Sequence, residues 1–331
     1  MPLHLENLSV LCADDAAFAR SLLHGYLDAL GVGNIYQARN GQEAIDLIKT
    51  HSPHMTLLDW EMQPVNGLEV LRFIRHDASS PNRAMPVIMV SAYTRVRYII
   101  EARNGGVSSY LAKPIVPRSL YMRMKSIIDY DQKYIRTASY FGVDRRKKQQ
   151  EQNETQEQQL FGTPQKHAPL DYEEVLETHV EPALLGKVVS GGGPPTKAQL
   201  LKAQNANNTA SVSYVKRLSH DLHRLRSIIE ALPNLTGQPP ELLQTLHNLC
   251  HDIRGTAGSF GYESITQLAD NLCNMAEDKH LLPANCNQLI MFHYRAMIVR
   301  LQGKDELEKN PATLEVIESL KELTSLHSLT G

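Results

Sequence analysis

The sequence predicts two domains of different fold class: a doubly wound α/β domain with a five-stranded parallel sheet, followed by an all-α helical bundle. Before about residue 130, five short apolar runs alternate with amphipathic stretches, whereas after about residue 210 apolar residues recur with helical spacing. The segment between them includes RRKKQQEQNETQEQQ from residue 145 and SGGGPP from residue 190, a composition typical of linkers. We therefore assign residues 1–130 to the α/β domain, 131–210 to a largely flexible linker, and 211–328 to the bundle.

Each apolar run in the first domain has the length of one buried strand and precedes a stretch with helical periodicity. Repeated strand–helix units imply a parallel sheet covered by helices on both faces. The expected strands are 8–12, 34–38, 54–58, 86–90 and 107–111, and the expected helices are 16–30, 42–49, 68–76, 95–103 and 117–129.

The bundle is predicted from apolar residues spaced i, i+3, i+4 and i+7 along the chain. The expected helices are 212–232, one that begins at about 240 after Pro239, 262–279, 284–302 and 312–327. A further short helix is expected within the linker, around residues 173–185.

Composition indicates a cytoplasmic protein. The net charge is −2 and the pI is about 6.7, which argues against a nucleic-acid partner or an anionic membrane surface. The four cysteines lie far apart without a CxxC pair, as expected for reduced thiols. The N-terminal stretch lacks a cationic region typical of signal peptides, and no apolar run approaches the roughly 18 residues of a membrane span.

Reactive side chains follow the predicted strands of the first domain. Asp14 and Asp15 come after the first run, Asp59 after the third, Ser91 after the fourth and Lys113 after the fifth. Because the carboxyl ends of parallel strands meet at one edge, we expect these side chains to lie together. An oxygen-only acidic cluster favours Mg²⁺, and Mg²⁺ with a lysine and a hydroxyl suits the oxygens of a transferring phosphoryl group. One carboxylate would then be the phosphoryl acceptor. The alternative is a set of ordinary polar loop residues.

The same residues carry a family resemblance. VLCADDAAFAR, LLDWEMQPVNGLEVL, VIMVSAY and SSYLAKP resemble the response-regulator receiver domain of bacterial chemotaxis regulators, a flavodoxin-like fold, over residues 5–129. The resemblance implies that Asp59 is the phosphoacceptor and that Asp15 binds Mg²⁺ directly, with Asp14 beside it. It further implies that the Glu61 backbone carbonyl contacts the metal. The remaining implied roles are contacts to phosphoryl oxygens for Ser91 and Lys113, with Ser91 and Tyr110 as switch residues.

A second candidate site lies on the helix that begins at about residue 240, in HDIRGTAGSFG. At 100° per residue, the apolar residues fall on one side of this helix, and the opposite side carries His247, His251, Arg254, Gly255 and Gly258. Each glycine costs a helix roughly 1 kcal/mol relative to alanine. We therefore expect an exposed stripe whose glycines let a partner approach the imidazole of His251. A metal site formed by His247 and His251 is an alternative, although no carboxylate or cysteine completes it.

LCHDIRGTAGSFGYESITQLADNLCNMAED resembles the histidine phosphotransfer (HPt) domain, whose mark is His-x-x-Lys-Gly, over roughly residues 211–305. The resemblance implies that His251 is the phosphohistidine and that Arg254 replaces the usual lysine. Gly255, Gly258 and His247 would form the docking surface.

The two resemblances together imply a bacterial phosphorelay protein that exchanges a phosphoryl group between Asp59 and His251, within the chain or through partners. Expected partners are a sensor histidine kinase and other receiver domains. No nucleotide-binding kinase motif is found, so we expect a phosphocarrier and not an enzyme. Two alternatives remain open: a receiver-controlled interaction module in which His251 is never phosphorylated, and a phosphate sink.

Overall fold

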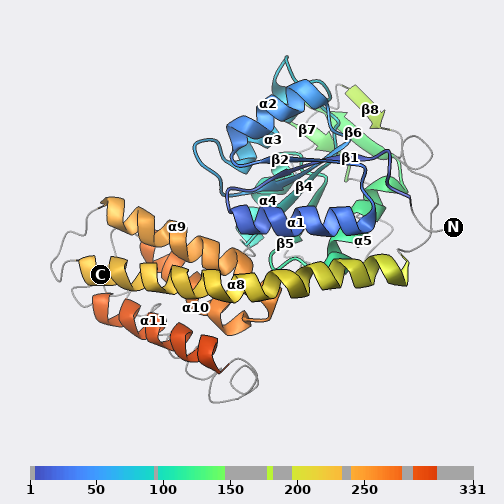
Figure 1. Ribbon diagram of the computed structural model, residues 1–331. Helices are drawn as coiled ribbons and strands as arrows, with labels where there is room; N and C mark the ends of the chain where they lie inside the picture. The colour runs from blue at the N-terminus through green and yellow to red at the C-terminus, as the bar shows by residue number, and fades with distance from the viewer. Residues whose placement is uncertain are drawn as a thin grey trace. The chain divides into compact units, whose positions relative to one another are not determined.

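The computed structural model describes residues 4–92, 96–145, 177–181, 196–232, 240–277 and 286–303. The chain forms two compact units, residues 1–206 and 207–331, which Figure 1 shows as an α/β part and a helical part. Both predicted fold classes are confirmed. No helix among the described residues is long and apolar enough to cross a membrane.

The first unit contains a five-stranded, all-parallel sheet with the order β2-β1-β3-β4-β5. Every residue of the three central strands is buried, because helices cover both faces of the sheet. In Figure 1, α1 and α5 lie on one face and α2 and α3 on the other. The strands are β1 (Ser9–Ala13), β2 (Asn34–Ala38), β3 (Met55–Asp59), β4 (Val87–Ser91) and β5 (Ser109–Ala112).

The helices of this unit begin and end where local chemistry dictates. The Asn66 side chain accepts a hydrogen bond from the Glu69 amide, and the Glu69 carboxylate accepts one from the Asn66 amide, forming a capping box. Gly31 ends α1 with a φ of 87°, a left-handed conformation that glycine adopts without steric cost. The helices are α1 (Ala17–Leu30), α2 (Gly41–His51), α3 (Gly67–His76), α4 (Val96–Asn104) and α5 (Pro117–Ile128).

The expected linker is where the structure differs most from the sequence prediction. Within it, β6 (Gln132–Arg136), β7 (Phe141–Val143) and β8 (Glu177–Glu181) form a three-stranded antiparallel sheet in the order β7-β6-β8, and the residues from Lys197 onward are helical. The helix expected around 173–185 is therefore wrong at 177–181, where the backbone is a strand. β8 pairs with β6, so the backbone N–H and C=O groups of residues 177–181 form hydrogen bonds in a sheet and not in a helix. The helical periodicity of the sequence does not contain this pairing.

A buried arginine of the first unit contacts the β6–β7 hairpin (residues 132–145). Arg75 is 0% exposed; its Nε donates to the Gly106 carbonyl at 2.9 Å, and its Nη1 donates to the carbonyls of Arg83 and Met85 at 2.6 and 2.8 Å. Its guanidinium also lies 5.3 Å from the ring centroid of Tyr134 on β6. The hairpin therefore completes the core of this unit, because Tyr134 is fully buried against it.

Backbone contacts bring the hairpin close to the segment before β5. A Cβ atom on Gly106 would lie 2.3 Å from the Phe141 carbonyl oxygen, and the φ of Gly106 is +85°. Ser108 Oγ lies 3.0 Å from Tyr134 Oη, and Arg145 donates to the Val107 carbonyl at 2.7 Å. Only glycine permits so close a backbone approach at position 106.

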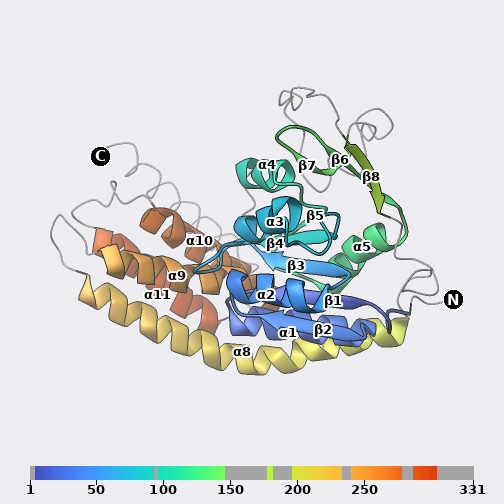
Figure 2. The same cartoon turned by 90° about the horizontal axis from the view of Figure 1, so that it is seen from above.

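The second unit is helical, as expected, with different boundaries. Its elements are α8 (Lys197–Ala231), α9 (Pro240–Ala257), the 3₁₀ turn η1 (Gly258–Phe260), α10 (Glu263–Glu277) and α11 (Cys286–Gln302). α8 begins at Lys197, well before the expected residue 212, and the division between the two units falls within this helix, after residue 206. The helix expected at 312–327 lies outside the described residues. Figure 2 shows α8, α9, α10 and α11 from a second direction.

Two details of α9 change the interpretation of its glycines. Gly255 is inside the helix, whereas Gly258 begins the 3₁₀ turn after the helix has ended. Gly261 closes this turn with a φ of 76°, and its amide donates to the Gly258 carbonyl. Gly258 therefore carries no penalty of a helix interior, and the expectation of two glycines within the helix is wrong.

Candidate functional site

Parallel topology brings the reactive residues of the first unit to one edge of the sheet. Asp14 follows β1, Asp59 ends β3, Ser91 ends β4 and Lys113 follows β5. Lys113 Nζ lies 2.9 Å from Asp14 Oδ2 and 3.1 Å from Asp59 Oδ1. The ligand atoms of Asp14, Asp15 and Asp59 all lie within 4.8 Å of one another. The three carboxylates and the ammonium thus form one cluster.

Burial changes the pKa values of the charged groups in this cluster. Asp14 and Asp59 are 0% exposed and Lys113 is 6% exposed, while Asp15 is exposed. Burial raises the pKa of Asp59 well above its ordinary value; Lys113 opposes the rise, and the nearby charges of Asp14 and Asp15 add to it. Burial alone would lower the pKa of Lys113, but Asp14 and Asp59 together raise it above its ordinary value. The ammonium is therefore held charged between two carboxylates.

Backbone hydrogen bonds fix the two buried carboxylates. Asp14 Oδ1 accepts from the Ala16 amide at 2.9 Å, and Asp59 Oδ1 accepts from the Trp60 amide at 2.9 Å. A Cβ atom on Gly67 would lie 2.0 Å from the Asp59 carbonyl oxygen, so only glycine fits where α3 begins. The Lys113 amide donates to the Ser91 carbonyl at 2.8 Å, which ties the ends of β4 and β5 together. These hydrogen bonds hold the carboxylates of Asp14 and Asp59 in fixed positions.

The donor set fits a hard divalent cation. Asp59 Oδ2 is buried and has no hydrogen-bond partner within the described part of the chain. A buried carboxylate oxygen without a partner is costly unless a cation or another donor joins it. Three carboxylates without histidine or cysteine are the ligands that Mg²⁺ prefers. The structure thus supplies protein ligands for this ion at Asp14, Asp15 and Asp59.

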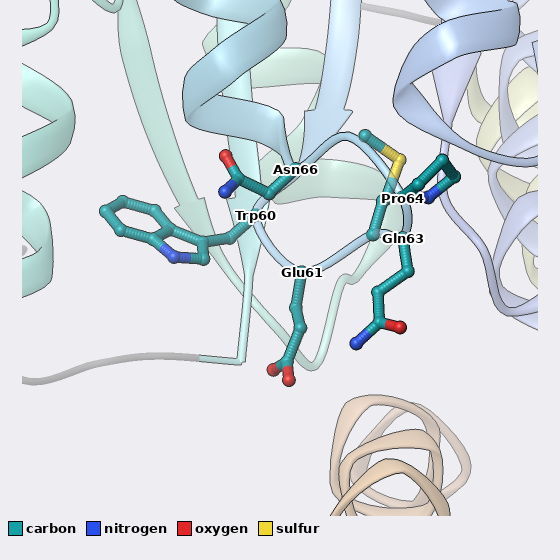
Figure 3. Close-up of a pocket in the computed structure, with 6 residues that line it drawn as sticks. Trp60, Glu61, Gln63, Pro64 and Asn66 are labelled. Atoms are coloured by element: carbon teal, nitrogen blue, oxygen red, sulfur yellow. The ribbon is translucent and has the colours of Figure 1, made fainter. Parts of the chain in front are cut away.

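A pocket lies on the loop between β3 and α3, next to Asp59. It is lined by Trp60, Glu61, Met62, Gln63, Pro64 and Asn66. Figure 3 shows the side chains of Glu61 and Gln63 extending in the same direction from the loop, with the Trp60 indole turned to another side. Trp60 packs edge-on against Tyr98 of α4, with ring centroids 5.5 Å apart.

The two expected switch residues lie in the sheet. Ser91 is fully buried at the end of β4, and Tyr110 is 6% exposed on β5, paired in register with Met89. Ser91 therefore lies at the same sheet edge as the carboxylates, whereas Tyr110 lies earlier along β5.

The expectation of an exposed stripe on α9 is wrong. His247, His251 and Arg254 retain only 6%, 5% and 4% of their exposed surface, and Gly255 and Gly258 are buried as well. A helical wheel divides a helix into one buried and one exposed side, whereas Arg254 on the expected exposed side is ion-paired with Asp270 of α10. The proposed docking surface of Gly255, Gly258 and His247 is therefore not open in this structure.

The two histidines lie near each other in the stripe. The rings of His247 and His251 are stacked, with an interplanar angle of 10° and centroids 6.4 Å apart. No cluster of three metal-ligating side chains involves them among the residues that the structure describes. The described residues therefore include no third side chain that would complete a metal site with His247 and His251.

Sequence reasoning missed Asp270 on α10. Its Oδ1 accepts from Arg254 Nη1 at 3.0 Å, so the arginine expected beside a phosphoryl group is ion-paired with the neighbouring helix. The available signal was that Asp270 and Asn271 interrupt the apolar pattern of this helix between Ala269 and Leu272.

Comparisons with known proteins agree with this geometry. A family model described as the response regulator receiver domain matches residues 10–125. The CheY homolog of Campylobacter jejuni is 30% identical over 122 residues, which cover 37% of this chain and 92% of that protein. The chain belongs to the response-regulator receiver family. The chemotaxis protein CheY-3 of Vibrio cholerae is 29% identical over 124 residues, covering 38% of this chain and 94% of the relative.

Solved structures are similar to part of this chain. The receiver domain of Francisella response regulator 1452 has 29% sequence identity and a TM-score of 0.33, covering 35% of this chain and 93% of that chain. Vibrio cholerae CheY4 has 22% identity and a TM-score of 0.34, covering 36% of this chain and 97% of that chain.

The helical unit of this receiver-family protein has its own match. A family model described as the Hpt domain matches residues 213–304, which include α9 and its histidines. Receiver and HPt domains are signalling modules, and their combination in one chain indicates two-component phosphorelay signalling. Such domains work with histidine kinases and other phosphorelay domains, and receiver domains typically bind Mg²⁺.

Proposed function

We propose that this chain carries phosphoryl groups at two places, on Asp59 of the receiver and on His251 of the helical bundle. The receiver is taken as residues 1–130 and the bundle as 211–328. The observation that carries the proposal is the cluster in which Lys113 joins Asp14 and Asp59 while Asp59 Oδ2 has no hydrogen-bond partner among the residues that the structure describes.

Asp59 is the proposed acceptor because its free carboxylate oxygen can attack phosphorus. An Asp59 oxygen forms the new P–O bond, the bond between phosphorus and the donor breaks, and the donor leaves with the electron pair. Lys113 and the Ser91 hydroxyl would bind the phosphoryl oxygens. Because Asp59 is buried, entry of a donor requires residues around the cluster to move.

Asp14, Asp15, Asp59 and the Glu61 backbone carbonyl are the groups that would hold Mg²⁺. When bound, the ion neutralises negative charge on the phosphoryl oxygens. Lys113 supplies a fixed positive charge at the same edge, and the backbone amides of Ala16 and Trp60 keep the buried carboxylates oriented.

Trp60 should report on this site, because it is the chain's only tryptophan and its amide binds Asp59. We expect its fluorescence to change on titration with Mg²⁺ and again on addition of acetyl phosphate. Asp15→Asn should weaken the Mg²⁺ response. An unchanged titration in this variant would contradict the role of Asp15 as a ligand.

His251 is the proposed carrier in the bundle. The lone pair of a neutral imidazole nitrogen forms a P–N bond while the P–O bond to an aspartyl phosphate breaks, which regenerates the carboxylate. Arg254, three residues further along α9, would bind the transferred phosphoryl oxygens.

Labelling and chemical stability test both sites. With Mg²⁺ and acetyl phosphate, the wild-type chain should acquire an acid-stable, alkali-labile label that Asp59→Asn abolishes. A label that survives alkali and is lost in acid should disappear in His251→Ala and persist in the matched control His247→Ala. Undiminished labelling of Asp59→Asn would contradict the receiver assignment.

The burial of His251 favours one second candidate. In it, the receiver controls a helical interaction module and the histidine is never phosphorylated. This candidate predicts that the alkali-stable label is absent from the wild-type chain even when a cognate phosphodonor is supplied.

A further inference from the structure

One ion pair in the helical bundle joins a nearly inaccessible arginine to a partly exposed acid. Arg254 Nη1 on α9 lies 3.0 Å from Asp270 Oδ1 on α10, and the two side chains are 3% and 47% exposed. The second carboxylate oxygen of Asp270 accepts from Asn274 Nδ2 at 3.3 Å, one turn further along α10. Asp270 is therefore held by its own helix while it binds the arginine of the next.

The pair differs from an ordinary surface salt bridge because its cationic end is desolvated. A guanidinium removed from water requires a partner that neutralises and hydrogen-bonds it, and loss of that partner leaves a costly buried charge. Asp270 supplies this partner from a different helix, sixteen residues along the chain. It can therefore determine where the guanidinium is directed.

Direction matters more for arginine than for lysine. A guanidinium donates hydrogen bonds only in its plane, in a fixed fork, whereas an ammonium presents three rotatable donors on a flexible stem. Because Arg254 is three residues after His251, the two side chains are neighbours on the surface of α9. An arginine at this position needs a group that orients its plane before it can bind phosphoryl oxygens attached to the imidazole.

We propose that Asp270 is a positioning residue that orients Arg254 for phosphoryl transfer at His251. The inference rests on the proposed role of His251 as a phosphohistidine, and it adds a residue on α10 that acts through Arg254 without touching the phosphoryl group. The Asp270 carboxylate accepts a hydrogen bond from one guanidinium nitrogen and so holds the plane of the fork.

The test measures transfer from His251 in the full-length chain. All donor chains carry Asp59→Asn, are labelled on the histidine with phosphoramidate, and transfer to full-length His251→Ala acceptor chains. We expect Asp270→Asn to slow transfer about tenfold, a typical coupling between residues of one hydrogen-bonded network. Asp270→Glu should recover most of the rate, because it retains the charge. Glu263→Gln is the matched control, because it neutralises an exposed acid at the start of the same helix.

A second background separates positioning from a merely structural role. In Arg254→Lys chains, Asp270→Asn should change the transfer rate less than twofold, because an ammonium needs no orientation. An equal loss in both backgrounds would show that Asp270 does not act through Arg254 and would overturn the inference. The same conclusion follows if Asp270→Asn transfers as fast as Glu263→Gln, or if Asp270→Glu fails to recover the rate.

Failure of the proposed function gives a different result. If the donor with an intact Asp270 acquires no label on His251, the phosphohistidine assignment fails before any Asp270 variant is compared. Thermal unfolding followed by circular dichroism identifies a variant that does not fold, in which case the comparison of Asp270→Glu with Glu263→Gln decides the inference. A Glu variant that transfers at the control rate supports it, and one slowed about tenfold overturns it.

Discussion

At the scale of single residues, the molecule satisfies its buried charges in two different ways. Lys113 is paired with Asp14 and Asp59, and these carboxylates keep it charged at the sheet edge. Arg75 instead donates to three backbone carbonyls, and burial lowers its pKa. The first arrangement leaves Asp59 Oδ2 without a hydrogen-bond partner among the described residues, whereas the second ties together three backbone segments beside the Tyr134 ring.

His293 on α11 illustrates the cost of a buried group that must remain neutral. Burial lowers its pKa, against a smaller opposing effect from the Leu289 carbonyl, which lies 2.8 Å from Nδ1. The unfolded chain therefore binds a proton more readily than the folded chain. Its contribution to stability is complete above the ordinary histidine pKa of about 6.5 and declines as the pH falls toward the lower folded value.

We predict that the bundle loses thermal stability between about pH 7.5 and pH 5, and that His293→Leu reduces this loss. Thermal unfolding of the full chain, followed by circular dichroism across this pH range, measures the effect. His220→Leu is the control, because that histidine is largely exposed and its removal should leave the pH dependence unchanged. A His293 variant with the wild-type slope would contradict the prediction.

At the scale of elements, the β6–β7 hairpin belongs to the receiver fold although it follows the last receiver helix. Tyr134 stacks on Phe141 with ring centroids 5.9 Å apart, and it lies beside the Arg75 guanidinium. Tyr134 Oη and Arg145 of the hairpin form hydrogen bonds with Ser108 Oγ and the Val107 carbonyl in the segment before β5. Because these contacts bury side chains of α3 and of the hairpin together, the two should unfold as one unit.

We predict that a chain ending at Asp129 is less stable than one ending at Arg145, by urea unfolding. Arg75→Met should destabilise the longer chain by about 3 kcal/mol, because three buried carbonyls lose their donor. The shorter chain lacks Tyr134, so there Arg75→Met removes the three hydrogen bonds but no contact with that ring, and it should destabilise the shorter chain less. Arg72→Met, at an exposed position of the same helix, serves as the control. Equal stability of the two chains would show that the hairpin is not integral.

At the scale of the whole molecule, the two candidate sites lie in different units. Asp59 lies in the unit of residues 1–206 and His251 in the unit of residues 207–331. Each unit contains the element that carries its own candidate residue, β3 for Asp59 and α9 for His251. Transfer between the sites therefore does not require that both belong to one molecule.

We predict that phosphoryl groups move between separate chains. Asp59→Asn chains, which retain the histidine, are mixed with His251→Ala chains, which retain the aspartate, and acetyl phosphate and Mg²⁺ are added. Alkali-stable label should appear on the Asp59→Asn chains at a rate that increases with their concentration. If label reaches His251 in the wild-type chain but never in the mixture, transfer is confined within one molecule, where the effective concentration can reach about millimolar.

The sequence alone determined the order of the five strand–helix units in the first domain and which residues lie at the carboxyl edge of its sheet. Residues 34–38 form the expected strand, and Asp14, Asp59, Ser91 and Lys113 meet because the ends of parallel strands must share an edge. Local periodicity and chain direction suffice for these conclusions. They depend on side chains within a few residues of one another and on the handedness of strand–helix–strand connections.

Only the tertiary structure decided which surfaces are covered and which residues pair across elements. Periodicity placed His251 and Arg254 opposite the main apolar stripe, but both side chains are buried, and Arg254 is ion-paired with Asp270 of α10. Asp270 reaches Arg254 from another helix, and Arg75 reaches Gly106 across 31 residues of sequence. The physical reason is that burial and ion pairing depend on segments distant in the chain. The amphipathic pattern of one helix records its principal contact and not the number of its neighbours.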